Sequence, residues 1–314
     1  MMTTPLPMRR TLLLLVLASA CSSDEAGEPL LAGFSPPAPG PGEVQYLSPI
    51  VRDIQPGEDR IICSYLDAYV EDDLDVARLA GYNTPGSHHI ILYTTSLAQT
   101  PNTHDCTDEE MVFLSMVGGT GGDAALSPEQ KLPEGLVRRV KGGNQLVIQT
   151  HWLNARDEVI DGQAAFNVRY EPISADRTPT DFMAVMNTTF AVTPGKSTAS
   201  VECTFKDPVN IWQLAGHQHD LGKHIKITYK PVNGESRVLI DDDWNYEWSF
   251  NPKFLDFTQA PMIARPGDKL SVDCEWSNPG QDTVKFPSEM CGAVAQFYPS
   301  TSQLVCFNGD WLGG

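Results

Sequence analysis

Hydrophobic and polar residues alternate with a period of two along most of the chain. The clearest segments are residues 145–153, 223–230, 237–241 and 269–276, which are rich in β-branched and aromatic side chains and are bounded by Gly, Pro, Asn or Asp. This alternation predicts half-buried β-strands. The best helical pattern, residues 71–79, is short. The sequence therefore predicts an all-β protein.

The length of 314 residues suits two domains of ordinary size. A polar stretch between Glu171-Pro172 and Thr178-Pro179 marks the expected boundary. We expect two antiparallel, jelly-roll-like β-sandwich domains, one over residues 46–175 and one over residues 176–314.

The first 20 residues have the layout of a secretory signal, in which Arg9 and Arg10 precede a short apolar run and small residues end it at Ala20. The run is too short to span a bilayer permanently. Cys21 follows at once and resembles the acylated cysteine of bacterial lipoproteins. We expect an exported lipoprotein anchored to a membrane by acyl chains on Cys21, at the periplasmic face or the cell surface. A plain secretory signal cut nearby is the alternative.

Residues 21–45 are rich in Pro and Gly and have no apolar periodicity, so they predict an extended tether. The whole chain carries a net charge of −18, and the loss of Arg9 and Arg10 with the signal would leave −20. So acidic a protein has no general attraction for phosphate backbones, which argues against nucleic acid as a partner.

Six cysteines remain beyond Cys21, and an even number in an exported protein predicts three disulfides. Spacing alone allows all 15 pairings of six cysteines.

The histidines are the candidate metal ligands. His217 and His219 are two residues apart, so on a strand both would point to one face. His88 and His89 would point to opposite faces of a regular strand, and they share a metal only if a bulge or strand end turns one of them or if different ring nitrogens are used. His151 lies within the predicted strand 145–153. Imidazole suits copper, zinc, iron and nickel.

An ordinary role remains open for each of these residues. A lone histidine is commonly exposed or hydrogen-bonded in the core, and we prefer that interpretation for His104 and His224. The thioether of Met290 would point to copper as a soft ligand, although a methionine beside Cys291 also fits a role as core residue.

Four motifs together resemble the copper type II, ascorbate-dependent monooxygenases, a family that includes peptidylglycine α-hydroxylating monooxygenase and dopamine β-monooxygenase. The motifs are His88-His89, Gln149-x-His151, His217-x-His219-x-Leu221-Gly222-Lys223 and Glu289-Met290-Cys291. The resemblance covers residues 46 to 310. It implies one copper ion in each sandwich domain, with the two sites facing across a cleft.

The resemblance also implies a role for each residue of the motifs. His88, His89 and His151 match the ligands of the copper that stores and delivers an electron, and Gln149 matches a residue near it. His217, His219 and Met290 match the ligands of the copper where O2 binds and the substrate C–H bond is attacked. A soft thioether favours Cu(I), the oxidation state that binds O2.

The disulfide pairing is also taken from the resemblance. It implies the pairs Cys274–Cys291 and Cys203–Cys306, which leaves Cys63 to pair with Cys106.

The chain departs from the family at several positions. Ile90, Thr95 and Gln218 replace a Met, a Cys and a Thr. Ala215 stands where the peptide hydroxylase has the Arg that pairs with the substrate carboxylate, and Gly292 and Val294 replace two further polar residues. A peptide C-terminus is therefore not the expected substrate, and the cleft should be more apolar.

These observations favour a dicopper monooxygenase that hydroxylates a C–H bond of a small molecule with O2 and an external reductant, ascorbate or a substitute. The globular part is expected to be monomeric. A non-catalytic copper-binding protein is the alternative, although the Met- and His-rich runs typical of copper buffers are absent from the sequence. A lipid-anchored adhesion module is a third possibility, which binding of two copper equivalents would exclude.

Overall fold

The computed structural model describes residues 28–107, 110, 113–121, 131–249, 251–300 and 302–312. The predicted signal and Cys21 lie outside these residues. Within the described ranges the protein is built mainly from strands; a short 3₁₀ helix, η1, spans Tyr246–Ser249, and Glu110 and Phe113 are also helical. The all-β prediction is therefore confirmed. None of the helical structure in the described ranges has the length and apolar character needed to cross a membrane.

The first half of the chain forms two five-stranded sheets. The strands are β1 (Glu43–Leu47), β2 (Val51–Ile54), β3 (Asp59–Tyr69), β4 (Leu74–Asn83), β5 (Ser87–Thr95), β6 (Asn102–Asp105), β7 (Ser115–Gly121), β8 (Leu136–Val140), β9 (Gln145–Leu153), β10 (Ile160–Gly162), β11 (Ala164–Pro172) and β12 (Thr178–Pro179). One sheet has the order β1-β11-β4-β8-β12 and the other β6-β3-β9-β5-β7, while β2 and β10 form a separate pair. Leu92 and Ile148 of one sheet and Leu79 and Phe166 of the other share one buried core, so the two sheets form a sandwich.

The second half forms a larger sandwich from a seven-stranded and a four-stranded sheet. The strands are β13 (Asp181–Asn187), β14 (Ala191–Val192), β15 (Gly195–Thr204), β16 (Val209–His217), β17 (Gly222–Lys230), β18 (Arg237–Asp243), β19 (Leu255–Asp256), β20 (Met262–Ala264), β21 (Lys269–Asn278), β22 (Val284–Lys285), β23 (Cys291–Tyr298), β24 (Leu304–Phe307) and β25 (Asp310–Leu312). The large sheet has the order β19-β16-β23-β13-β24-β25, with β20 also on β16, and the small sheet has the order β15-β21-β17-β18, while β14 and β22 form a separate pair. Ile211 and Phe297 of the large sheet pack with Ile227 and Val272 of the small one.

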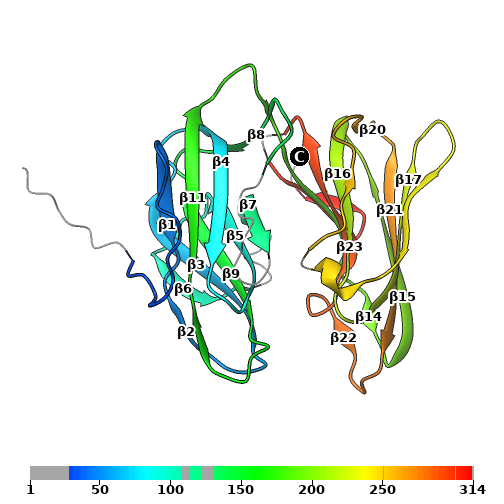
Figure 1. The fold of residues 1–314 in the computed structure, drawn as a ribbon. Helices are drawn as coiled ribbons and strands as arrows, with labels where there is room; N and C mark the ends of the chain where they lie inside the picture. The colour runs from blue at the N-terminus through cyan, green and yellow to red at the C-terminus, as the bar shows by residue number, and fades with distance from the viewer. Residues whose placement is uncertain are drawn as a thin grey trace, which may run out of the picture.

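The two sandwiches stand side by side, as Figure 1 shows, and each has its own core. The sheet pairings are antiparallel except for β8 with β12 and β13 with β24. Arg138 of β8 joins the two halves, because its guanidinium donates hydrogen bonds to the Thr180 carbonyl at 2.6 Å and to Gln296 at 3.1 Å.

Three disulfides join the pairs that the resemblance implies: Cys63–Cys106, Cys203–Cys306 and Cys274–Cys291. Each bond lies within one sandwich. The second-half bond between Cys274 and Cys291 fastens the first residue of β23 to β21.

Three details differ from the sequence-based expectations. Residues 74–79 of the short helical pattern lie in strand β4, because β4 is paired on both sides and its backbone is satisfied within the sheet. The first sheet also continues past residue 175, since β12 still pairs with β8 and the second sandwich begins with β13.

The third difference concerns the predicted tether, of which the structure describes residues 28–45. Strand β1 already begins at Glu43, and the segment before it lies against the first sandwich. Gln163 donates to the Pro29 carbonyl at 2.9 Å and accepts from the Leu31 amide at 2.8 Å, and Asn167 donates to the Pro37 carbonyl at 3.0 Å. The described part of this segment therefore lies against the first sandwich, because buried amide side chains of that sandwich form hydrogen bonds with its backbone.

Candidate metal centres

The first candidate site is the group of His88, His89 and His151, hereafter the first histidine group. His88 and His89 lie at the start of β5, and His151 lies on the adjacent strand β9. The pairing is Ser87 with Trp152 and His89 with His151, so His88 is an extra residue in β5. This is a β-bulge. It allows the side chains of two consecutive residues of a strand to point to the same site.

The three imidazoles converge closely. One ring nitrogen from each lies within 4.8 Å of those of the other two. His88 Nδ1 is 3.0 Å from His151 Nδ1. The ring centroids are 4.6 Å apart for His88 and His151, 4.8 Å for His89 and His151, and 5.5 Å for His88 and His89. A single metal ion could be bound by one nitrogen from each ring.

Burial keeps His88 and His89 in the neutral form, which binds metals. Burial, with a further effect from the charge of His151, lowers the pKa of His88 to about 4 and that of His89 to about 3. Both rings are therefore neutral at physiological pH, and neutral imidazole is the ligand form.

Asp59 orients His151. Its Oδ1 lies 2.6 Å from His151 Nε2, and this hydrogen bond lowers the pKa of the Asp59 carboxyl below its ordinary value. With Nε2 donating to the carboxylate, Nδ1 of His151 is left on the side of His88. A carboxylate on the far nitrogen of a ligating histidine is the usual outer-shell arrangement, since it selects the tautomer and the ring orientation.

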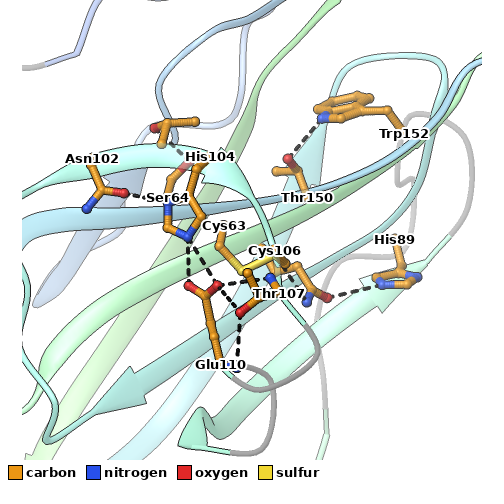
Figure 2. The surroundings of a disulfide bond; sticks show 12 residues. Cys63, Ser64, His89, Asn102, His104, Cys106, Thr107, Glu110, Thr150 and Trp152 are labelled. Carbon is orange, nitrogen blue, oxygen red and sulfur yellow. Dashed lines mark hydrogen bonds and ion pairs between the residues drawn. A yellow bond between two sulfur atoms is a disulfide. The ribbon is translucent and has the colours of Figure 1, made fainter. Parts of the chain in front are cut away.

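Gln149 has the same relation to His89. Its Oε1 lies 3.3 Å from His89 Nε2, and its Nε2 lies 3.9 Å from Cys106 Sγ. Figure 2 shows His89 and the Cys63–Cys106 disulfide, whose strands β5 and β3 lie on either side of β9. Gln149 is fully buried, so this contact holds the His89 ring rigidly.

The second candidate site is built at the end of β16. His217 is the last residue of that strand and His219 follows two residues later, with ring centroids 5.2 Å apart. Burial, with a smaller effect from the charge of His219, lowers the pKa of His217 to about 3. The two rings are nearly perpendicular, at 87°.

Met290 lies directly before β23, close to the backbone of His219. The paired part of β16 and β23 ends at His217 and Gly292, and beyond this end the backbone amides of His219 and Met290 both donate to one oxygen of Glu289. The backbone segments that carry His217, His219 and Met290 therefore meet at one end of this ladder.

Glu289 ties the two segments together. It is almost fully buried, and its Oε1 accepts hydrogen bonds from the backbone amides of His219 at 2.6 Å and Met290 at 2.9 Å. Its Oε2 accepts from the Leu221 amide at 2.9 Å. One carboxylate therefore sets the position of both backbone segments that carry the second set of candidate ligands.

The face beside the second site is apolar. Ala215 pairs with Val294 on the same ladder, two positions from the pair of His217 and Gly292, and Ala215 is fully buried. A Cβ on Gly292 would stand 2.0 Å from the sulfur of Met186 and 2.7 Å from the Val185 carbonyl. Gly292 therefore has no room for a larger side chain.

The two remaining histidines lie outside both groups, as expected. His104 has Glu110 Oε1 at 2.9 Å from Nε2 and Asn102 at 2.5 Å from Nδ1, and Figure 2 shows it among these partners. His224 lies between Asp241 at 2.9 Å and Asp243 at 3.1 Å.

Sequence reasoning missed the roles of Asp59 and Glu289. Asp59 is 92 positions from His151, and only the pairing of β3 with β9 brings it there. Glu289 stands directly before Met290 in the Glu-Met-Cys motif, which was the one available signal.

Residues 178–310 match the family model described as the C-terminal domain of the copper type II ascorbate-dependent monooxygenases. The matched range spans most of the second sandwich and includes His217, His219 and Met290, so this part of the chain is similar to that family. None of the curated proteins matches the chain.

Similar solved structures include recombinant peptide N-glycanase F, at 11% identity and a TM-score of 0.34, with 84% of this chain and 98% of that chain covered. Another is that of infectious bursal disease virus, Gx strain, at 9% identity and a TM-score of 0.19, with 82% of this chain and 72% of that chain covered. Similarity this low supports no inference about function.

Proposed function

We propose that the protein is an exported, lipid-anchored dicopper monooxygenase that hydroxylates a C–H bond of a small apolar molecule. The observation that carries this proposal is the convergence of three imidazoles on the β5 bulge, in a chain whose second sandwich matches the C-terminal domain model of a copper monooxygenase family. The net reaction would be R–H + O2 + 2 e⁻ + 2 H⁺ → R–OH + H2O, with both electrons from an external reductant, ascorbate or a substitute.

His88, His89 and His151 would hold one copper, and His217, His219 and Met290 the other. Copper bound at the two sites would supply one-electron redox chemistry, so that two electrons are available for each O2. Asp59 and Gln149 would keep the rings of the first site in place, and Glu289 would fix the backbone of the second.

Small electrostatic effects between the two sandwiches support sites that face each other across a cleft. The pKa of His88 is lowered mainly by burial and by His151, and that of Asp59 mainly by its hydrogen bond with His151; His219 makes the smallest contribution to both. The pKa of His89 is lowered mainly by burial, with the smallest contribution from His217. Because the effect of a charge weakens with distance, these contributions favour one shared region over two remote sites.

The apolar face of Ala215, Gly292 and Val294 supports an uncharged substrate group next to the second site. A substrate carboxylate placed there would lose its hydration, and none of these three residues carries a positive charge to pair with it. A peptide C-terminus is therefore not the proposed substrate.

The test is copper-dependent O2 uptake. The reconstituted protein should bind two copper ions per chain and consume O2 with reductant and a panel of small aromatic and aliphatic compounds, giving one hydroxylated product per O2. Isotope-labelled O2 should put one labelled oxygen atom in the product. Two bound copper ions with no product across a broad panel would instead favour the alternative of a non-catalytic copper-binding protein.

A further inference from the structure

A cavity in the first sandwich is lined by five of the 22 Lys and Arg residues of an acidic protein. It has a volume of about 400 Å³, which lies in the range of small-molecule sites. It lies between β4, β8 and β11, away from both histidine groups. The charged residues that line it are Arg78, Lys131, Arg138, Arg169, Arg177 and Glu171.

These cations are not balanced by neighbouring carboxylates. Glu43 pairs with Arg78, Glu171 with Arg169 and Arg177, and Asp181 with Arg138, while Asp75 is shared between Arg177 and Arg139. Six cations thus meet four carboxylates. Lys131 has no carboxylate partner among the residues that the structure describes.

Two guanidinium groups each have one N–H donor without a hydrogen bond among the described residues. Arg138 is 3% exposed, and its terminal nitrogens bond to Thr180 and Gln296, yet its Nε has no acceptor within the described ranges. Arg169 Nε also lacks a hydrogen bond there, and its nearest carboxylate oxygen, from Glu171, is 3.8 Å away. Buried donors are almost always satisfied, by protein, water or a ligand.

The rest of the lining is apolar. Val76, Leu79 and Val117 reach the cavity from the sandwich core, and Leu132 and Leu136 lie at its other side. A cavity with guanidinium groups and an aliphatic wall suits a ligand that has an anionic head and a hydrocarbon body.

We propose that this basic cavity binds a small amphiphilic anion, a carboxylate with a short hydrocarbon chain. Its oxygens would accept from Lys131 and Arg169, and its chain would lie against the valines and leucines. The site is independent of the copper ligands, and Arg138 places it next to the junction between the sandwiches.

The test is calorimetric titration of the whole chain with hexanoate, at low ionic strength and after treatment with a chelator, so that the outcome does not depend on the copper proposal. Hexanoate should bind at one site per chain and at least 10-fold more tightly than 1-hexanol, its neutral analogue. Equal binding of the two compounds, or no binding of hexanoate, would overturn the proposal.

Variants locate the site. Lys131→Gln and Arg169→Gln should each weaken hexanoate binding about 5-fold or more, without a change in the thermal unfolding midpoint. Lys206→Gln is the matched control, since it removes the same charge from an exposed position outside the cavity. A control that weakens binding as much as the two cavity variants would show an effect of net charge alone and would count against the site.

Discussion

At the scale of single residues, three side chains that are not themselves candidate ligands hold the candidate ligands in position. They are Asp59, Gln149 and Glu289. Asp59 and Gln149 each contact the far nitrogen of a histidine, and Glu289 binds backbone amides on two segments. These contacts restrict ring and backbone motion before any metal arrives, which lowers the entropy cost of binding it.

The most sensitive single residue is Met290. Met290→Ile should leave the fold intact, because swaps of similar volume usually cost less than about 1.5 kcal/mol. It should also leave the first site occupied and abolish O2-dependent turnover, because isoleucine offers no soft ligand for Cu(I). X-ray absorption of the reduced, copper-loaded protein should show a Cu–S component that the variant lacks. A wild-type spectrum with only nitrogen and oxygen scatterers, in a sample with two copper ions per chain, would return Met290 to a packing role.

Glu289 should act as a positioning residue. Glu289→Gln keeps the size but replaces one acceptor oxygen by a donor, so one of three backbone amides loses its partner at a cost of about 1–3 kcal/mol. We expect the affinity of the second site for Cu(I) to fall about 10-fold while the first site is unchanged, measured by competition with a chromophoric chelator. Glu275→Gln, at an exposed position, is the control for charge. Equal loss at both sites would indicate general destabilisation and would refute a specific positioning role.

At the scale of elements, the bulge in β5 decides whether the first histidine group exists. A regular strand would send His88 and His89 to opposite faces, and the extra residue against β9 brings both to one side. The turn before β5 leads directly into this bulge, and Gly86 in that turn has a φ of +92°.

Gly86→Ala should therefore disturb the first site. The left-handed backbone costs an alanine about 1–2 kcal/mol, and its Cβ would stand 2.3 Å from Cδ1 of Ile160. We expect lower stability in urea unfolding together with weaker copper binding at the first site.

The matched control is Gly143→Ala, which has a φ of +82° and no atom within 4 Å of the added Cβ. It should lose only the stability that the left-handed backbone costs, about 1–2 kcal/mol, and keep its copper. If both variants lose copper equally, the turn at Gly86 has no special role in shaping the site.

At the scale of the whole molecule, two separately cored sandwiches are joined by the chain around residues 172–181 and by the contacts of Arg138. The segment from Pro29 to Pro37 is docked on the first sandwich, so the membrane attachment proposed at Cys21 would hold this sandwich close to the lipid surface.

The anchor gives a prediction at this scale. Cys21→Ala should move the protein from the membrane fraction to the soluble exported fraction, because the acyl chains would supply the membrane affinity. Fractionation with immunoblotting would measure this, and the copper content of the released protein should be unchanged. A variant that stays with the membranes would place the anchor elsewhere.

The sequence alone was enough to predict local structure and to single out the candidate ligand residues. Alternation with period two predicted strands such as β9 and β21, because the side-chain geometry of a strand is set by neighbouring residues. The order of the histidine and Met-Cys motifs pointed to the family that the second sandwich matches.

Long-range contacts required the tertiary structure. The bulge at His88 appears only when β5 pairs with β9, and Asp59 reaches His151 only when β3 pairs with β9. The docking of Pro29 and the basic cavity around Arg138 likewise depend on side chains from distant strands. The physical reason is that pairing register and sheet packing are decided by the total burial of both sandwiches, which the pattern of a single segment does not contain.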